Sequence, residues 1–175
     1  MTIPRIIQIS RSNAEILRQT LLASSPYEGC ALLLGNQCKP NNSLTKICWQ
    51  IQLIWPCCNI WSSKEEVSWN KASLNIDNLN NSNFSKRNRF KIDPKEQILA
   101  QKWSRSSHYK VLGSAHSHIS DEAVPSSIDL SSSLYSRLML IIDQSGNIRA
   151  WWIPDDQNFE EVQVSFSINS KNIRK

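Results

Sequence analysis

Short apolar runs alternate in this chain with segments whose apolar residues recur at helical spacing, and this alternation restricts the fold to a mixed one. Strands are predicted at residues 28–34, 47–55, 110–118, 137–143, 148–153 and 162–168. Helices are predicted at residues 13–24, 94–107 and 126–135. A turn signal at residues 144–147 predicts a hairpin, so part of the sheet is expected to be antiparallel. The sequence therefore predicts an α/β (α+β) fold.

Capping and breaking residues indicate where these elements begin and end. Ser12 and Glu15 form a capping-box pattern at the start of the first helix. Asp93 and Pro94 supply an N-cap and a first-turn proline for the second helix. Pro56 is expected to end the strand at 47–55, because proline has no N–H to donate to a neighbouring strand.

The length of 175 residues and the hydrophobic content of 40% suffice for one core, so a single domain over residues 1–175 is expected. Residues 62–91 differ in composition from the rest, because seven asparagines crowd this polar stretch. We expect this segment to be an insertion loop within the domain.

Composition excludes several classes of function. The four glycines lie too far apart to build a glycine-rich phosphate loop, and the longest uncharged stretch, 47–63, is too polar for a membrane-spanning helix. The N-terminus has no signal-peptide pattern, and the five cysteines contain no C-x-x-C pair, so reduced thiols and a cytoplasmic location are expected. The net charge of +5 favours acidic partners only weakly, and we do not read its basic residues as a nucleic-acid site.

Two of the three histidines, His116 and His118, lie at the end of a predicted strand. Side chains two residues apart in a strand point the same way, so both imidazoles can reach one point. Ser126 follows eight residues later, and Asp129 lies three residues beyond it, on the first turn of a predicted helix. A loop of this length can bring Asp129 back to the strand end as a third ligand.

Two imidazoles, one carboxylate and a water describe an open tetrahedral zinc site that is suited to hydrolysis. Zinc lowers the pKa of its bound water to about 7 and polarises a carbonyl group. Glu28 is the candidate general base, which accepts a proton from the water and later delivers it to the leaving amine. Ser126 is the candidate donor to the developing oxyanion.

Each of these residues also has a plainer interpretation. An H-x-H pair in a strand is commonly surface or core filler, and Ser126 with Asp129 makes an ordinary capping box. Glu28 can be a simple strand-edge acid. A Ser/His/Asp triad could be assembled from Ser114 or Ser126 with His116 and Asp129, but no G-x-S-x-G turn accompanies either serine. Cys30 is better explained as a small buried hydrophobe than as a nucleophile.

Glu28, in the run PYEGCALLLG, followed by H-S-H, seven residues and S-x-x-D, resembles the signature of the JAMM (MPN+) metallopeptidase family. The resemblance covers residues 3–153 and implies the Mov34/JAB fold, a curved mixed β-sheet flanked by helices. It implies a zinc peptidase in which His116, His118 and Asp129 bind Zn²⁺, Glu28 is the general acid/base and Ser126 stabilises the oxyanion. Ile119 departs from the family pattern, which usually has proline after the second histidine.

The resemblance is greatest to small prokaryotic members, which implies hydrolysis of peptide or isopeptide bonds at the C-terminal tail of a ubiquitin-like sulfur-carrier protein. Two alternatives stay open. One is a catalytically inactive MPN-type scaffold that binds protein partners, and the other is a zinc hydrolase of small amides.

Overall fold

The computed structural model describes residues 3–38, 47–62, 85–119, 122–132, 138–154 and 158–167. Within these ranges the strands are β1 (Ile6–Ser10), β2 (Cys30–Cys38), β3 (Cys48–Cys57), β4 (Lys110–Ser117), β5 (Leu138–Ile142), β6 (Ile148–Trp152) and β7 (Glu160–Ser167). The helices are α1 (Arg11–Leu22), α3 (Pro94–Ser106) and α4 (Ser127–Ser132). Among the described residues, no helix has the length and apolarity that a membrane span needs.

The strands form one sheet in the order β1-β3-β2-β4-β5-β6-β7, which closes into a barrel where β7 pairs with β1. The pairs β1–β3, β1–β7 and β4–β5 are parallel, and the other neighbours are antiparallel. The predicted mixed α+β fold is confirmed, with the difference that the curved sheet closes on itself.

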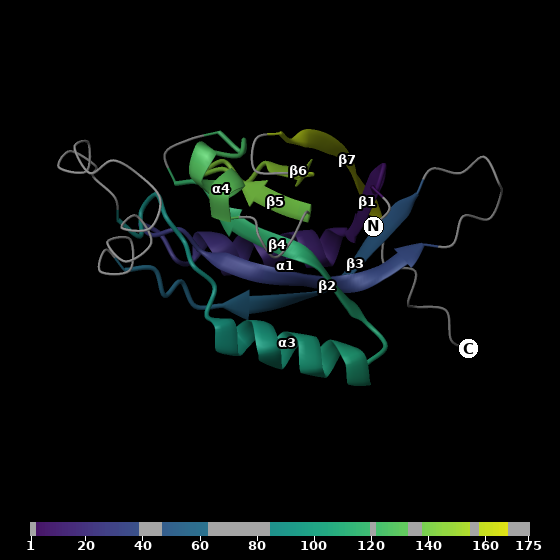
Figure 1. Ribbon diagram of the computed structural model, residues 1–175. Helices are drawn as coiled ribbons and strands as arrows, with labels where there is room; N and C mark the ends of the chain where they lie inside the picture. Colours follow the sequence, from purple (N-terminus) through teal and green to yellow (C-terminus); the bar gives the residue numbers. More distant parts are fainter. Residues whose placement is uncertain are drawn as a thin grey trace.

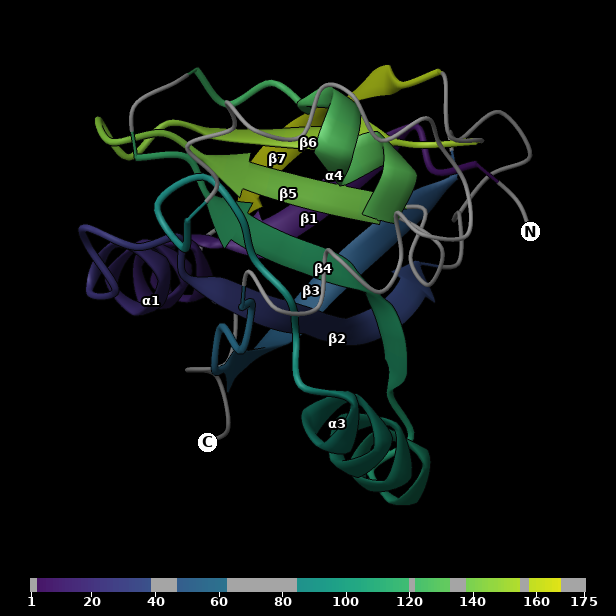
Figure 2. The same ribbon diagram turned by 60° about the vertical axis from the view of Figure 1, so that its left-hand side comes forward.

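Alternation along the strands divides the apolar side chains between two faces of the sheet. Leu138, Leu140 and Ile142 of β5 lie in the main core, together with Leu17 and Leu21 of α1. The alternate residues of β5 face outward and join a second cluster with Leu130 of α4. A third cluster joins β2 to Ala100 of α3. Figures 1 and 2 show the result, with α4 beside β5 and β6 and α3 beyond β2.

The structure corrects two local predictions. The N-cap of α1 is Ser10, whose hydroxyl accepts a hydrogen bond from Asn13 N at 3.1 Å, so the expected capping box at Ser12 is wrong. Pro56 does not end β3, which runs on to Cys57. Since β1 pairs with β3 only over residues 48–51, β3 has a single neighbour around Pro56, and such a position tolerates proline.

Two further differences depend on long-range pairing. Strand β1 was not expected, and it is held between β3 and β7. A bulge in β3 also breaks the expected alternation, because Leu34 pairs with Leu53 while Gly35 pairs with Ile51. Beyond this bulge Ile54, not Leu53, lies in the main core.

The helix α3 and the hairpin at 143–147 agree with the sequence. Asp93 caps α3 by accepting a hydrogen bond from Lys95 N at 2.9 Å. Gly146 has a φ of 83° in the hairpin turn, a conformation that favours glycine. Most of the expected insertion at 62–91 lies outside the described residues, so the single domain with its insertion stays a prediction.

Candidate metal centre

Strand β4 brings two imidazoles to one point. His116 is the penultimate residue of β4, and His118 directly follows the strand. The backbone N–H of His118 donates to Ile142 O at 2.8 Å, which extends the alignment of β4 with β5. The two side chains therefore keep the same direction, and their Nε2 atoms lie 2.9 Å apart.

Asp129 reaches the imidazoles from the first turn of α4. Its Oδ1 lies 3.4 Å from His116 Nε2, and its Oδ2 lies 3.4 Å from His118 Nε2. Ser126 fixes the carboxylate, because its backbone N–H and its hydroxyl both donate to Asp129 Oδ2 at 2.7 Å. The Asp129 N–H approaches Ser126 Oγ at 3.3 Å in return, so the capping box and the convergence of side chains coexist.

The three side chains fit a small divalent cation. One ligand atom from each of His116, His118 and Asp129 lies within 4.8 Å of the others, and none of the three residues is more than 6% exposed. Tetrahedral bonds to zinc of about 2.0–2.2 Å place neighbouring ligand atoms about 3.3–3.5 Å apart. Each imidazole Nε2 lies 3.4 Å from a different oxygen of Asp129, and the two Nε2 atoms, 2.9 Å apart, need to separate only slightly to reach this spacing. The donor set is therefore suitable for zinc.

Outer contacts orient both rings. His118 Nδ1 lies 2.8 Å from Glu122 O, and a proton donated there leaves the lone pair of Nε2 directed at the other ligands. Phe90 stacks on His116, with ring centroids 4.3 Å apart and an interplanar angle of 21°. Among the described residues, His116 Nδ1 has no hydrogen-bond partner.

Burial and charge shift the three pKa values in different directions. Burial lowers the pKa of His116, with the Asp129 carboxylate opposing it, so this imidazole is neutral near pH 7. Burial also acts to lower the pKa of His118, but hydrogen bonds to Asp129 and the Glu122 carbonyl raise it overall. Burial would raise the pKa of Asp129, but the two imidazoles and Ser126 hold it far below its usual value. A neutral imidazole and an ionised carboxylate are the forms that bind metal.

Glu28 lies two residues before β2, the strand that pairs with β4. Cys30 pairs with His116, Ser117 N donates to Gly29 O at 3.1 Å, and Gly29 N donates to Ser117 Oγ at 2.9 Å. Continuing this register places Glu28 opposite His118. Glu28 is 5% exposed, and its negative charge contributes to the raised pKa of His118. The acid predicted as the first residue of a strand thus lies just before β2, opposite His118 in the extended register.

The close approach of α1 explains the glycine after Glu28. A Cβ atom at Gly29 would lie 2.3 Å from Leu21 O, which is too close for any side chain. Ser117 Oγ also lies 3.4 Å from Leu21 O. The end of α1, the segment that carries Glu28 and the end of β4 are therefore packed together at backbone distance.

Asn59 connects Glu28 to the segment that carries Phe90. Its amide makes four hydrogen bonds with backbone groups: to Glu28 O (3.0 Å) and Arg89 O (2.9 Å), and from Trp61 N (3.0 Å) and Lys91 N (3.1 Å). Glu28 N also donates to Lys86 O at 2.7 Å. Nothing in the local sequence around Asn59 indicates this role, because three of the four partners lie about thirty residues away.

Trp151 of β6 supports the loop that follows His118. Its indole N–H donates to Ala123 O at 2.9 Å, next to Glu122, whose carbonyl contacts His118. Trp151 is 4% exposed and packs in the second apolar cluster with Leu130 of α4. This support was not predicted either, since a tryptophan in an apolar strand indicates only a core residue.

The other candidate groups do not form a competing site. Ser126 Oγ donates its proton to Asp129 and not to an imidazole, so Ser126 is not arranged as the nucleophile of a triad. Burial raises the pKa of Cys30 to about 12, so its thiol is not an activated nucleophile. The third histidine, His108, lies two residues after α3 and is not part of the cluster.

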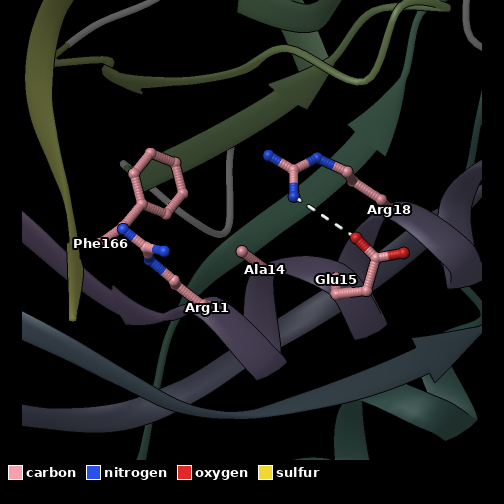
Figure 3. Close-up of a pocket in the computed structure, with 5 residues that line it drawn as sticks. All are labelled: Arg11, Ala14, Glu15, Arg18 and Phe166. Carbon is pink, nitrogen blue, oxygen red and sulfur yellow. Dashed lines mark ion pairs between the residues drawn. The ribbon is translucent and has the colours of Figure 1, made fainter. Parts of the chain in front are cut away.

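A surface pocket of about 380 Å³ lies elsewhere, on α1 and β7. It is lined by Arg11, Ala14, Glu15, Arg18 and Phe166 (Figure 3). Arg18 is engaged by Glu15, at 3.6 Å, and by Gly146 O, at 2.7 Å. None of the candidate ligands lines this pocket.

The closed mixed sheet and its buried His-His-Asp group belong to a known class of protein. Residues 10–154 match the family described as prokaryotic homologs of the JAB domain, so the chain belongs to this family and the resemblance found in the sequence is confirmed. The chain is 29% identical over 76 residues to the desampylase of Pyrococcus furiosus, an alignment that covers 43% of this chain and 54% of that protein. The chain thus spans about half the length of this curated relative.

Two solution structures have a similar fold. A protein from Desulfitobacterium hafniense superimposes with a TM-score of 0.68 at 19% identity, and one from Salinibacter ruber with a TM-score of 0.59 at 17% identity. Each comparison covers 93% of both chains. At these identities, the likeness concerns the fold alone.

Proposed function

We propose that this protein is a zinc-dependent metallopeptidase that hydrolyses peptide or isopeptide bonds at the C-terminal tail of a ubiquitin-like sulfur-carrier protein. The observation that carries this proposal is the convergence of His116, His118 and Asp129 on one buried point, with Glu28 just before the neighbouring strand β2. The match to a desampylase supports a modifier protein as the substrate class. A cytoplasmic location accompanies this proposal.

Three side chains would coordinate the metal, and neighbouring groups already orient two of them. The Nε2 atoms of His116 and His118 and a carboxylate oxygen of Asp129 would hold Zn²⁺. Bound there, zinc supplies Lewis acidity that polarises the scissile carbonyl and lowers the pKa of water. Ser126 fixes the Asp129 carboxylate and Glu122 O fixes the His118 ring, so these two ligands need little reorientation to bind a metal.

Glu28 is the general acid/base in this proposal. Its carboxylate accepts a proton from the attacking water and delivers it to the leaving amine. Burial excludes bulk water from this carboxylate, and the Asn59 amide holds its backbone in place. Ser126 Oγ donates to Asp129 in the structure, so a hydrogen bond to the oxyanion requires its hydroxyl to rotate away from that carboxylate.

The test uses two substrates and one chelator. The zinc-loaded protein is incubated with a ubiquitin-like carrier protein extended at its C-terminus by one amino acid, and separately with an N-acetyl amino-acid amide. Intact mass spectrometry of the carrier should show loss of the added residue, and EDTA should abolish this loss. Cleavage of the small amide alone would support a small-amide hydrolase, and cleavage of neither substrate would support the inactive scaffold.

A further inference from the structure

Both ends of the β2–β3 pairing carry a cysteine opposite a cysteine. Cys30 pairs with Cys57 at the end nearest the metal centre, and Cys38 pairs with Cys48 at the other end. All four are free thiols. Cys38 is eight residues along β2 from Cys30, a distance of about 25 Å in an extended strand. The pair of Cys38 and Cys48 is therefore separate from the candidate metal centre.

The two pairs differ in where their sulfur atoms lie. Cys38 Sγ and Cys48 Sγ are 3.0 Å apart and in direct contact. At the other end, the thiol of Cys30 donates to Cys57 O at 3.6 Å, and the thiol of Cys57 donates to Trp55 O at 3.5 Å. Only the pair at the far end has the arrangement that comes before a sulfur–sulfur bond.

The backbone at this pair already has the separation that a disulfide needs. Directly opposed residues in antiparallel strands have Cα atoms about 4.5–5.5 Å apart. Disulfides span Cα separations of about 4.4–6.8 Å. Cys38 and Cys48 are directly opposed, so a bond between them requires no movement of β2 relative to β3.

We propose that Cys38 and Cys48 form a thiol–disulfide exchange site that is oxidised by a low-molecular-weight disulfide of the glutathione type. The thiolate of Cys38 attacks one sulfur of glutathione disulfide, which forms a mixed disulfide and releases one glutathione thiolate. Cys48 then gives up its proton and attacks the sulfur of Cys38, which releases the second glutathione. The protein loses two electrons and two protons, and one glutathione disulfide becomes two glutathione thiols.

The surroundings set the order of these two steps. Cys38 is half-buried, whereas Cys48 is 8% exposed. Burial and the contact with Cys38 raise the pKa of the Cys48 thiol to about 12, so Cys48 is the resolving thiol. Gln8 of β1 lies 3.6 Å from Cys38 Sγ, and Ile6 of β1 pairs with Cys48. The bond therefore closes the nine-residue connection 39–47 where β1, β2 and β3 meet.

The experiment treats the full-length protein with glutathione disulfide, blocks remaining thiols with iodoacetamide and digests it with trypsin. Cys38 falls in the peptide 19–46 and Cys48 in the peptide 47–64, so the bond links two peptides whose fragmentation locates it. The matched controls are the Cys57→Ser/Cys58→Ser double variant, which should still form the link, and Cys38→Ser, which should not. The midpoint temperature of thermal unfolding of the wild-type protein should rise by about 5 °C on oxidation.

A link between Cys38 and Cys48 that disappears in Cys38→Ser supports the proposal. Two carbamidomethylated thiols at these positions after oxidation, or a glutathione adduct that stays on Cys38, would overturn it. A lower unfolding temperature after oxidation would contradict the claim that the native strands accommodate the bond. None of these results depends on metal or peptidase activity, so failure here is distinguishable from failure of the proposed function.

Discussion

Replacing Glu28 by glutamine isolates the proton chemistry of the proposed reaction. The side chain keeps its size, and the hydrogen bonds of Glu28 with Asn59 and Lys86 use backbone atoms that the substitution leaves intact. The three candidate ligands are also unchanged. We therefore expect Glu28→Gln to fold and to bind zinc with the wild-type stoichiometry.

The expected loss is in turnover. General acid–base catalysis contributes about 10²–10⁴ in rate, and at about 1.4 kcal/mol per factor of ten this corresponds to about 2.8–5.6 kcal/mol of activation free energy. Burial of Glu28 at 5% exposure keeps bulk water from replacing the carboxylate, so the loss should be at least about a hundredfold. The assay is release of the C-terminal residue from an extended carrier protein under single-turnover conditions, with zinc measured in the same samples.

Glu122→Gln is the matched control, because the Glu122 side chain is exposed and its contact with His118 uses the backbone carbonyl. It should turn over substrate at the wild-type rate. If Glu28→Gln retains near-normal turnover, Glu28 is not the general base and the proton has another route. If Glu28→Gln loses zinc together with activity, its carboxylate supports the metal instead.

Three further predictions concern packing and pH. Gly29→Ala places a methyl group 2.3 Å from Leu21 O and should lower the free energy of unfolding by about 1–3 kcal/mol in urea titrations; an unchanged midpoint would refute the close packing. Asn59→Ala removes four hydrogen bonds to backbone groups and should lower the free energy of unfolding by at least about 2 kcal/mol and reduce turnover, whereas Asn36→Ala, which removes only an exposed hydrogen bond to Gln52, should change neither; equal effects would remove Asn59 from the support of the site. Zinc affinity measured by competition titration should fall as the pH is lowered, because protons compete for His118, whose pKa is raised; affinity that is independent of pH between 5 and 8 would contradict this.

Local signals predicted the elements that depend on local interactions. Helix α3 begins at its Asp93 cap, and the hairpin turns at Gly146, because capping and left-handed backbone are decided within a few residues. Strand β1 was not predicted, because a segment of five residues shows little periodicity. Its position is determined by pairing with β3 and β7, which come much later in the chain. The shift of face in β3 likewise depends on a bulge against β2.

The candidate site shows the same division. The spacing of His116, His118 and Asp129 predicted a shared point because strand alternation and the first turn of a helix are local geometry. The position of Glu28 depends on the register of β2 against β4, which no local pattern specifies. Asn59 and Phe90 act through contacts with residues far away in the chain, so a single sequence carries no signal for them.

Zinc content is the most direct test of the central claim that the three side chains bind one catalytic cation. The protein is purified, loaded with zinc, freed of excess metal and measured by elemental analysis, together with His116→Ala and the control His108→Ala, whose imidazole lies at the end of α3. We predict about one zinc per chain for the wild-type protein and for His108→Ala, and loss of zinc in His116→Ala. Less than about a tenth of an equivalent in the wild-type protein, with no uptake on titration, would contradict the account.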